Sequence, residues 1–439
     1  MSSYAHHGPV EAARRLFDEM PERSVVSWNA MLSGYVQNDR PDEGLRLFDQ
    51  MVGAGVRPNE TTWVSIVAVC SAKGDARFAE SIARTIMERK VPMNCFLETA
   101  LIDMYAGCGN LVKARMIFDE MEDRSWVSWN AMIAAYAKEG DLNAARELFD
   151  GMPAKDVISW NTMISGYSQN GQFGVALELF GDMTAVKGMM PDEVTMSSLI
   201  SACGRLGCLE HGRWLAQYMQ ENQIEPTVSV YNALIFMYSS CGSLEEAKRV
   251  FEEMPKRDVS SYNSLISGLA ANGDGYEAVA LMRQREEGIK PDAITYLGVL
   301  TACSHAGLTE EGCRVFEMIE SPTVDHYACK VDLLGRAGRL DEARKVIDDM
   351  PVRPHAGVYG ALLHASRIHK RVELGELAAE ELFRLEPGDA GNYVLLSNIY
   401  ASARKWGFVE KVRRVIRERG VDKVSGRSRI ELDGKLHLK

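Results

Sequence analysis

Trp160-Asn161-Thr162-Met163-Ile164-Ser165-Gly166-Tyr167 decides the fold, because near-copies of this stretch recur along the whole chain. Earlier copies begin at Trp28 and Trp129, and later ones begin at Tyr231 and Tyr262. Self-similarity with a period of roughly 20 to 50 residues indicates a repeat architecture. A repeat array of 439 residues needs no single large core, since each repeat contacts only its neighbours. We therefore expect a repeat protein.

The repeats alternate between shorter and longer lengths. The aromatic residue that opens each copy, or its equivalent, recurs at spacings of 35, 35, 31, 31, 36, 35, 31, 34 and 31 residues. These ten anchors are Trp28, Trp63, Glu98, Trp129, Trp160, Met196, Tyr231, Tyr262, Tyr296 and Tyr327.

Each repeat shows two amphipathic helical patterns. In the repeat that begins at Trp129, apolar residues recur every three to four positions on either side of a break at Gly140-Asp141. The pattern predicts an all-α fold, a right-handed α-solenoid of helix-turn-helix repeats whose first helices line the concave face.

Changes in this pattern predict four segments. Residues 1–24 contain only a second helix and form a truncated first repeat, so we expect Met1 to be either an internal start or the edge of a truncated gene. Residues 25–355 hold about ten repeats, and residues 356–423 hold two looser helical pairs. In residues 424–439, two short apolar runs flank Asp433-Gly434, which predicts a hairpin.

Composition favours a soluble protein without a metal or other cofactor. No apolar run approaches the roughly 18 residues of a membrane helix. The net charge of −11 argues against indiscriminate binding to nucleic acid, because phosphate affinity comes mainly from Lys and Arg. No Cys-x-x-Cys occurs, and packing thiols in a reducing compartment are favoured over metal or redox roles. Five of the nine cysteines fall at equivalent repeat positions: Cys70, Cys203 and Cys303, and Cys108 and Cys241.

The residue after the aromatic anchor is a recurrent asparagine. Asparagine is a poor helix-interior residue, so its repetition should gain nothing for folding and suggests a ligand. The alternative is an asparagine ladder in which neighbouring repeats hydrogen-bond one another. These residues are Asn29, Asn130, Asn161, Asn232 and Asn263.

The last residue of each repeat is a second recurrent choice. All of these residues are good N-caps for the following helix, so capping alone could explain them. Capping does not explain why four of the asparagines share a repeat with a terminal aspartate. An amide and a carboxylate together suit the hydrogen-bonding edge of one nucleic-acid base. The last residues are Asn59, Ser125, Asp156, Asp192, Thr227, Asp258 and Asp292.

A third position, three residues before the asparagine position, is apolar in six repeats. Such side chains could sandwich bases, but they could equally be part of the core, and the sequence does not decide between these alternatives. The residues are Val26, Phe96, Val127, Ile158, Val194 and Ile294.

With these three positions, the chain resembles the pentatricopeptide repeat family, in particular its plant subclass with mixed repeat lengths. Proteins of this family read one RNA base per repeat. The resemblance implies that Asn with Asp prefers uridine, that Asn with Asn prefers cytidine or uridine, and that the N-terminus lies toward the RNA 5′ end. It implies uridine for Asn130/Asp156, Asn161/Asp192, Asn232/Asp258 and Asn263/Asp292, a pyrimidine for Asn29/Asn59, and a purine for Thr99/Ser125 and Ser197/Thr227.

Some repeats depart from the pattern. Three have no side-chain amide at the asparagine position, so no base is assigned to them: Val64/Asn94, Leu297/Thr323 and Ala328/His355. Ser229 and Ser260 replace the apolar residue at the third position.

The C-terminal segments resemble the family's E1 and E2 motifs, followed by a partial E+ segment. In the family such tails accompany C-to-U editing of mitochondrial or chloroplast transcripts. The chain lacks the His-x-Glu and Cys-x-x-Cys that a zinc deaminase needs, so we expect no enzyme activity and a deaminase supplied in trans. Two alternatives stay open: a factor for RNA stabilisation or splicing, and a protein-binding scaffold like tetratricopeptide repeats.

Overall fold

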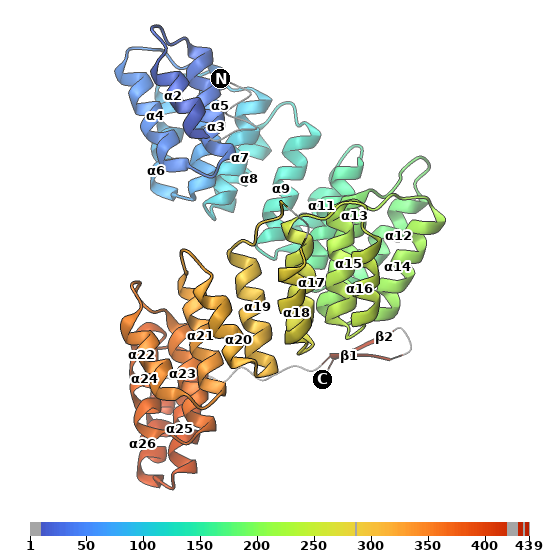
Figure 1. The fold of residues 1–439 in the computed structure, drawn as a ribbon. Helices are drawn as coiled ribbons and strands as arrows, with labels where there is room; N and C mark the ends of the chain where they lie inside the picture. The colour runs from blue at the N-terminus through green and yellow to red at the C-terminus, as the bar shows by residue number, and fades with distance from the viewer. Residues whose placement is uncertain (1–9, 286–287, 419–428, 433–434, 439) are drawn as a thin grey trace. The chain divides into compact units, whose positions relative to one another are not determined.

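The computed structural model describes residues 10–285, 288–418, 429–432 and 435–438 and forms two compact halves, Met1–Thr195 and Met196–Lys439. Figure 1 shows that the described residues are almost entirely helical, with first and second helices alternating along the chain. The all-α helical-repeat prediction is confirmed, and the predicted handedness stays a prediction.

In the N-terminal half each repeat contributes a first helix with an odd number and a second helix with an even number. The helices are α2 (Val10–Asp18), α3 (Val25–Gln37), α4 (Pro41–Gly53), α5 (Glu60–Lys73), α6 (Ala76–Glu88), α7 (Cys95–Gly107), α8 (Leu111–Glu120), α9 (Trp126–Lys138), α10 (Leu142–Gly151), α11 (Val157–Gln169) and α12 (Phe173–Ala185).

The same alternation continues in the C-terminal half, with α13 beginning just before the division. The helices are α13 (Glu193–Leu206), α14 (Leu209–Glu221), α15 (Val228–Ser240), α16 (Leu244–Glu253), α17 (Val259–Ala271), α18 (Gly275–Arg283), α19 (Ala293–Ala306), α20 (Thr309–Glu317), α21 (Val324–Arg336), α22 (Leu340–Asp349), α23 (Ala356–Ile368), α24 (Val372–Leu385), α25 (Ala390–Ser402) and α26 (Trp406–Glu418).

Local sequence explains where the helices of a repeat begin and end. Asp156 caps α11 by accepting a hydrogen bond from the Ser159 backbone N–H. Gly140 adopts a φ of 84° between α9 and α10, a conformation that favours glycine. Asp141 then caps α10 by accepting from the Ala144 N–H. The residues between the helices therefore favour the end of one helix and the start of the next.

In many places a contact between two aromatic rings joins one repeat to the next. A buried phenylalanine near the end of a second helix meets the aromatic anchor of the following repeat edge to face, with ring centroids 4.8 to 5.7 Å apart. Four of these paired anchors, Trp28, Trp63, Trp160 and Tyr262, are buried, whereas Trp129 and Tyr327 are half-buried. The pairs are Phe17–Trp28, Phe48–Trp63, Phe118–Trp129, Phe149–Trp160, Phe251–Tyr262 and Phe316–Tyr327.

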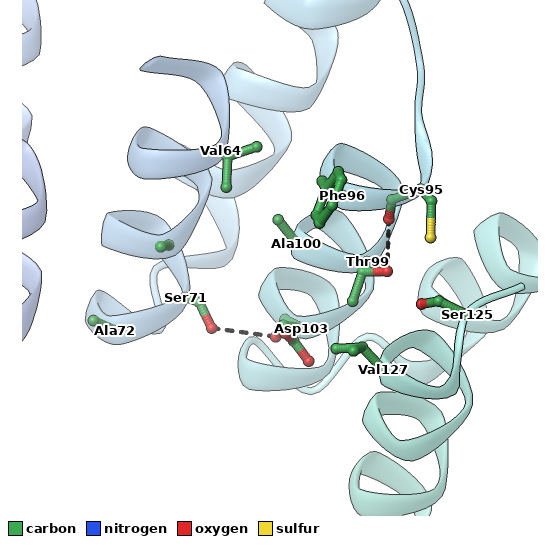
Figure 2. Close-up of a pocket in the computed structure, with 11 residues that line it drawn as sticks. Val64, Ser71, Ala72, Cys95, Phe96, Thr99, Ala100, Asp103, Ser125 and Val127 are labelled. Atoms are coloured by element: carbon green, nitrogen blue, oxygen red, sulfur yellow. Dashed lines mark hydrogen bonds between the residues drawn. The ribbon is translucent and has the colours of Figure 1, made fainter. Parts of the chain in front are cut away.

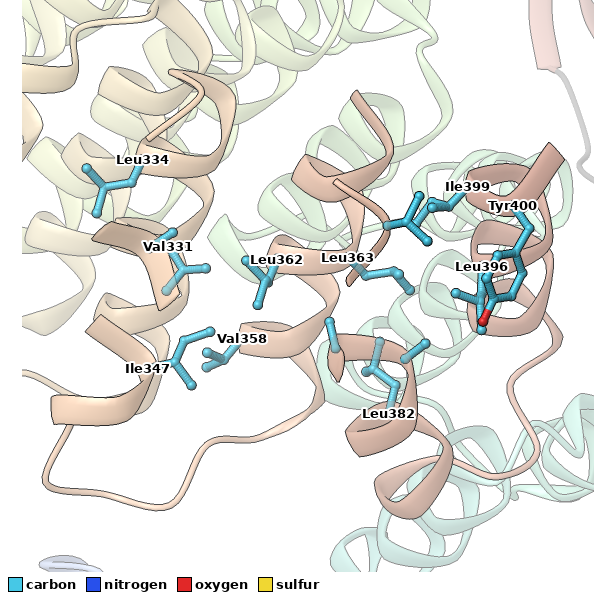
Figure 3. Packing of buried hydrophobic residues seen from close by; sticks show 14 of the residues in the cluster. Val331, Leu334, Ile347, Val358, Leu362, Leu363, Leu382, Leu396, Ile399 and Tyr400 are labelled. Atoms are coloured by element: carbon cyan, nitrogen blue, oxygen red, sulfur yellow. The ribbon is translucent and has the colours of Figure 1, made fainter. Parts of the chain in front are cut away.

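The C-terminal helical pairs belong to the same continuous core as the last repeats. Figure 3 shows Val331 and Ile347 packed toward Val358, and Leu363 packed toward Ile399, in one cluster that runs from α21 to α26. The predicted boundary at residues 355 and 356 therefore marks a change in sequence pattern within a continuous hydrophobic cluster.

The predicted C-terminal hairpin is confirmed. Strand β1 (Arg429–Leu432) pairs antiparallel with β2 (Lys435–Leu438), with Leu432 opposite Lys435. The flanking residues 419–428, 433–434 and 439 lie outside the described residues.

Three of the repeated cysteines are core thiols, as predicted. Cys70, Cys203 and Cys303 are fully buried. Burial raises the pKa of Cys70 to about 12 and that of Cys303 to about 11, so both remain protonated thiols near neutral pH. Cys108 and Cys241 are half-buried at helix ends. Among the described residues, no three His, Cys, Asp or Glu side chains are grouped to hold a metal ion, and no helix could span a membrane.

Candidate nucleic-acid interface

All six apolar side chains at the third position are exposed. Their exposed fractions run from 47% for Val194 to 77% for Phe96. Each lies in the first turn of a first helix, beyond the reach of the core that the aromatic anchors fill. The alternative that assigned these residues to the core is therefore wrong. Large apolar side chains repeated at one exposed position are available for contact with a ligand.

Two of these side chains frame a pocket around a predicted base-reading pair. The pocket has a volume of about 380 Å³, and its lining includes Ile158 and Val194 together with Asn161 and Asp192. Lys138 contributes a cation to the same lining. The structure thus brings the apolar, amide and carboxylate positions of one repeat to one place.

A second pocket repeats this arrangement at the pair Thr99/Ser125. It has a volume of about 670 Å³, and Figure 2 shows Phe96, Thr99, Ser125 and Val127 among its lining residues. The Thr99 hydroxyl donates to the Cys95 carbonyl at 2.7 Å, so its oxygen lone pairs remain to accept hydrogen bonds from a ligand. Both volumes fall in the roughly 300–1,000 Å³ range of small-ligand sites.

Asn161 lies at the centre of a hydrogen-bonded bridge between two repeats. Its Nδ2 donates to Asp192 Oδ1 at 2.8 Å, and its Oδ1 accepts from the Thr195 hydroxyl at 2.5 Å. Equivalent bridges join Asn29 to Asn59 (3.0 Å) and Thr62 (2.8 Å), and Asn263 to Asp292 (3.1 Å) and Thr295 (2.6 Å).

These bridges correct one expectation from the sequence. Folding does have a use for Asn29, Asn161 and Asn263, because each is buried and ties its repeat to the next. Neighbouring repeats are therefore hydrogen-bonded through these three asparagines, as the alternative expected, but through threonines and not as a ladder of asparagines. The partners are the last residue of the repeat and a threonine three positions later, and only Asn29 pairs with another asparagine.

Asn130 and Asn232 lack this bridge, and Asn232 Nδ2 instead donates to the Ser260 hydroxyl of the next repeat at 3.3 Å. The Oδ1 atoms of both are buried without a hydrogen-bond partner in the described part of the chain. A serine replaces the threonine in the following helix. The Ser159 hydroxyl donates to Asp156 at 2.7 Å, and the Ser261 hydroxyl donates to Asp258 at 2.9 Å. No hydrogen bond joins the predicted pairs Asn130/Asp156 and Asn232/Asp258 among the described residues.

The sequence also distinguishes the bridged repeats from the unbridged ones, by residues other than the recurrent asparagine. The bridged repeats end in proline followed by the last residue, at Pro58, Pro191 and Pro291, and a threonine follows three residues after that. In the unbridged repeats Lys155 and Arg257 precede the aspartate. Thr62, Thr195 and Thr295 are therefore site residues that the sequence reasoning missed.

Several of the last residues of the repeats cap the helix that follows them. Asp156, Asp258 and Asp292 each accept the backbone N–H of the third helical residue, whereas Thr227 makes no side-chain cap bond. The hydrogen bonds to these three aspartates in the described chain end on Oδ1. Capping therefore leaves Oδ2 as an acceptor for a ligand.

Hydrogen bonding also sets the charge of Asp292. Burial alone would raise its pKa, but hydrogen bonds from Thr295 and Asn263 outweigh that effect and hold the pKa below its usual 3.8. The carboxyl is thus ionised near neutral pH. Because the folded-state pKa is lowered, its stabilising contribution is present above about pH 4 and is lost as the pH falls through the lowered value.

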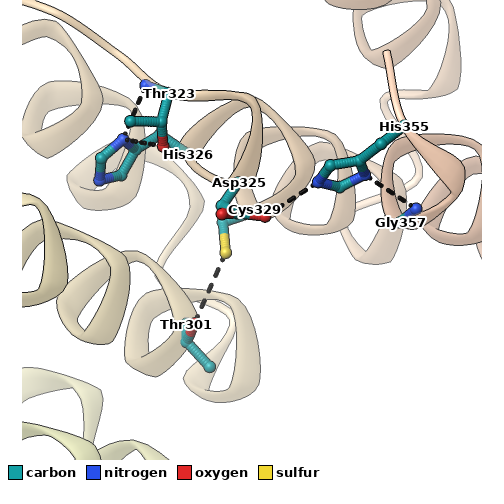
Figure 4. Close-up of polar contacts among 7 residues, drawn as sticks. All are labelled: Thr301, Thr323, Asp325, His326, Cys329, His355 and Gly357. Atoms are coloured by element: carbon teal, nitrogen blue, oxygen red, sulfur yellow. Dashed lines mark hydrogen bonds and ion pairs between the residues drawn. The ribbon is translucent and has the colours of Figure 1, made fainter. Parts of the chain in front are cut away.

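Figure 4 shows how the pattern changes in the repeats without a side-chain amide. His326 takes the place of the bridging threonine, accepting at Nδ1 from the Thr323 N–H (3.0 Å) and donating from Nε2 to the Ala293 carbonyl (2.8 Å). Asp325 occupies the third position, and its carboxylate lies 2.9 Å from His355 Nε2. This Asp325–His355 contact stands where other repeats have an apolar side chain at the third position, and His355 still caps α23 by accepting the Gly357 N–H at Nδ1.

Comparison with known proteins identifies the repeats. A PPR repeat model matches residues 1–25, 99–125, 127–157, 194–224, 229–259, 294–321 and 331–354. A PPR repeat family model matches residues 23–71, 155–205 and 257–305, and an E motif model matches residues 369–431.

Curated relatives from Arabidopsis thaliana match nearly the whole chain. One pentatricopeptide repeat-containing protein is 44% identical over 443 residues, covering 100% of this chain and 61% of its own length. A mitochondrial one is 41% identical, covering 98% and 64%. A putative one is 36% identical, covering 100% and 70%. Other relatives are named as chloroplastic. The chain spans less than two thirds of the length of the first three relatives.

Among solved structures, the maize pentatricopeptide repeat protein PPR10 is 19% identical, with a TM-score of 0.43, and the match covers 96% of this chain and 78% of that one. PPR10 in complex with an 18-nt psaJ RNA element matches with a TM-score of 0.47 at 19% identity, covering 95% and 78%. On the repeat models and the full-length sequence matches, the chain belongs to the pentatricopeptide repeat family.

Proposed function

We propose that this chain binds single-stranded RNA with sequence specificity, one base per repeat, and marks sites for C-to-U editing of an organelle transcript. The observation that carries the proposal is the pocket in which Ile158 and Val194 flank Asn161 and Asp192. Apolar side chains there would hold a base by its faces while the amide and carboxylate contact its edge.

The hydrogen-bonding groups of Asn161 and Asp192 that the bridge does not use are complementary to uridine. One Asn161 amide hydrogen and the Asp192 Oδ2 remain after the bridge is made. A donor beside an acceptor matches the adjacent O4 and N3–H of uracil. Cytosine carries an amino group and an unprotonated nitrogen at these positions, so it would face donor with donor and acceptor with acceptor. The pair Asn263/Asp292 offers the same groups.

Affinity would come from the sum of several such sites. The net charge of −11 supplies little general attraction to phosphate. The exposed apolar side chains would supply base contacts that do not depend on charge, and Phe96 could add aromatic stacking, which contributes roughly 1–3 kcal/mol per base. These side chains are Val26, Phe96, Val127, Ile158, Val194 and Ile294.

The editing role rests on the C-terminal part of the chain. Residues 369–431 match the E motif. In the proposed role the repeats select the site, and the C-terminal helices recruit a deaminase and other editing proteins in trans. Relatives named as mitochondrial and as chloroplastic support placement in one of these organelles.

Substitution of Asp156 by asparagine tests the base-reading rule. We expect the preference for uridine over cytidine at the base read by Asn130/Asp156 to fall by roughly threefold to tenfold or reverse, as one discriminating hydrogen bond is exchanged. Asparagine is also a good N-cap, so the fold should be retained. The measurement is fluorescence-anisotropy titration with RNAs that differ only at that base.

Asp141→Asn is a matched control for this experiment. Asp141 is likewise a helix cap, but it begins the second helix α10 and lies outside the predicted base-reading positions. Its variant should keep the wild-type preference. An Asp156→Asn protein with an unchanged uridine-to-cytidine ratio would rule out the base-reading assignment.

Loss of the gene tests the editing role. We expect a null mutant to lose editing at one or a few organelle cytidines, because site recognition is base-specific, and the unaltered gene should restore editing. Sequencing of organelle transcripts from mutant, parent and complemented lines measures the edited fraction. Unchanged editing together with reduced transcript abundance or splicing would assign the chain to RNA maturation instead.

A further inference from the structure

We propose that Thr195 and Thr295 are positioning residues that fix the orientation of the base-reading asparagine in the preceding repeat. This proposal rests on the RNA-binding function above. It predicts two classes of repeat with different selectivity, which the identity of the asparagine alone does not distinguish. The bridged class contains Asn29, Asn161 and Asn263, and the unbridged class contains Asn130 and Asn232.

The orientation of the bridged amide follows from its partners. The Asp192 carboxylate only accepts hydrogen bonds, so Nδ2 of Asn161 must face it. Oδ1 then faces the Thr195 hydroxyl. That hydroxyl already accepts the Asp192 backbone N–H, which leaves its one proton to donate. Its distance to Asn161 Oδ1 is 2.5 Å, against 3.1 Å to Asp192 Oδ1, so the asparagine is the nearer acceptor.

Thr295 repeats this geometry. Its hydroxyl lies 2.6 Å from Asn263 Oδ1 and 2.9 Å from Asp292 Oδ1. Both threonines are buried, and the second substituent on Cβ restricts χ1, which holds the hydroxyl in place. Serine lacks that methyl group, and the Ser159 and Ser261 hydroxyls donate to their own caps instead.

The consequence for recognition is a difference in what the asparagine can present. A bridged asparagine has its Oδ1 engaged and its amino group aimed at the carboxylate, so it meets a base as a donor. An unbridged asparagine has a buried Oδ1 without a partner among the described residues, and a hydrogen-bond donor on a base could satisfy it. Reorientation of that amide would make cytosine less unfavourable and so weaken the preference for uridine without abolishing it. The bridged repeats should therefore select uridine over cytidine more strictly.

Thr195→Val removes the hydroxyl while keeping the shape of the side chain. We expect the uridine-to-cytidine affinity ratio at the base read by Asn161/Asp192 to fall roughly fivefold, the value of one hydrogen bond. The ratio at the base read by Asn263/Asp292 should stay at its wild-type value in the same protein. Anisotropy titrations with RNAs that change one base at a time give both ratios.

Thr184→Val is the matched control, because the hydrogen bond of the Thr184 hydroxyl in the described structure is to the Gly181 carbonyl within α12. Both ratios should be unchanged in this variant. Thr195→Ser retains the hydroxyl for the cap at Asp192 and should lower the Asn161/Asp192 ratio in the same direction, as the hydroxyl turns to the aspartate. If Thr195→Val does not fold, the serine variant decides.

The outcomes separate this proposal from the RNA-binding function. An unaltered protein that shows no base preference at either position would overturn the RNA-reading function itself. A selective unaltered protein whose valine or serine variant binds both RNAs more weakly by the same factor would overturn the positioning role and leave threonine a purely structural residue. A changed ratio at Asn161/Asp192 alone supports the proposal.

Discussion

Replacing Phe149 with alanine should lower the free energy of unfolding by about 3–5 kcal/mol. Phe149 is 1% exposed, and its ring meets that of Trp160 edge to face with centroids 4.9 Å apart. The Lys155 ammonium lies 5.0 Å from the centroid of the Phe149 ring. The substitution therefore removes buried area, an aromatic pair and a cation–π contact, and it leaves a cavity between two repeats.

The effect should concentrate in the neighbouring helices. Repeats in such arrays are stabilised by their own packing and by nearest-neighbour contacts, so amides of α10 and α11 should lose protection from hydrogen exchange first. Urea unfolding together with hydrogen-exchange mass spectrometry measures both quantities. Met116→Ala is the control, because Met116 is 56% exposed on α8, and it should change stability by less than about 0.5 kcal/mol. Equal effects of the two variants would contradict the proposed role of the aromatic pair.

Replacing Asn29, Asn161 and Asn263 together with alanine should weaken binding to the matched RNA roughly a hundredfold, at about fivefold for each lost hydrogen bond. Each substitution removes the amide from one proposed base site. The fold should persist, since the Thr62, Thr195 and Thr295 hydroxyls can donate to their own caps, as Ser159 and Ser261 do.

The comparison needs a matched variant and a mismatched RNA. Asn143 is an exposed asparagine on the second helix α10, so Asn143→Ala should leave RNA affinity unchanged. Affinity for an RNA without uridine at the three positions should fall far less in the triple variant. If the triple variant binds matched RNA as tightly as the wild type while its melting temperature falls, the asparagines serve folding alone.

The repeat phase and the helical pairs were predictable because they depend on local periodicity. The anchors, the apolar faces and the Gly-Asp breaks are each short-range patterns, and every helical pair predicted from them is present in the described chain. The hairpin at Arg429–Leu432 and Lys435–Leu438 was predictable for the same reason.

Whether a single side chain on a helix face is buried or exposed was harder to predict. The apolar residue at the third position could have been core or exposed, because both occur at helical spacing. The structure shows Val127 and Ile158 exposed, while the Trp129 and Trp160 anchors of the same repeats pack against a phenylalanine of the preceding repeat. The exposure decides in favour of a surface role that periodicity alone left open.

By itself the sequence determined the repeat architecture of this protein, the positions of its caps and the recurrence of Asn161 with Asp192. Only the tertiary structure decided that Asn161 serves two purposes. Its bond to Thr195 joins residues 34 positions apart, and that contact exists only once one repeat has packed on the next. Whether a hydroxyl turns to its own cap or to the preceding asparagine depends on this packing and on one methyl group.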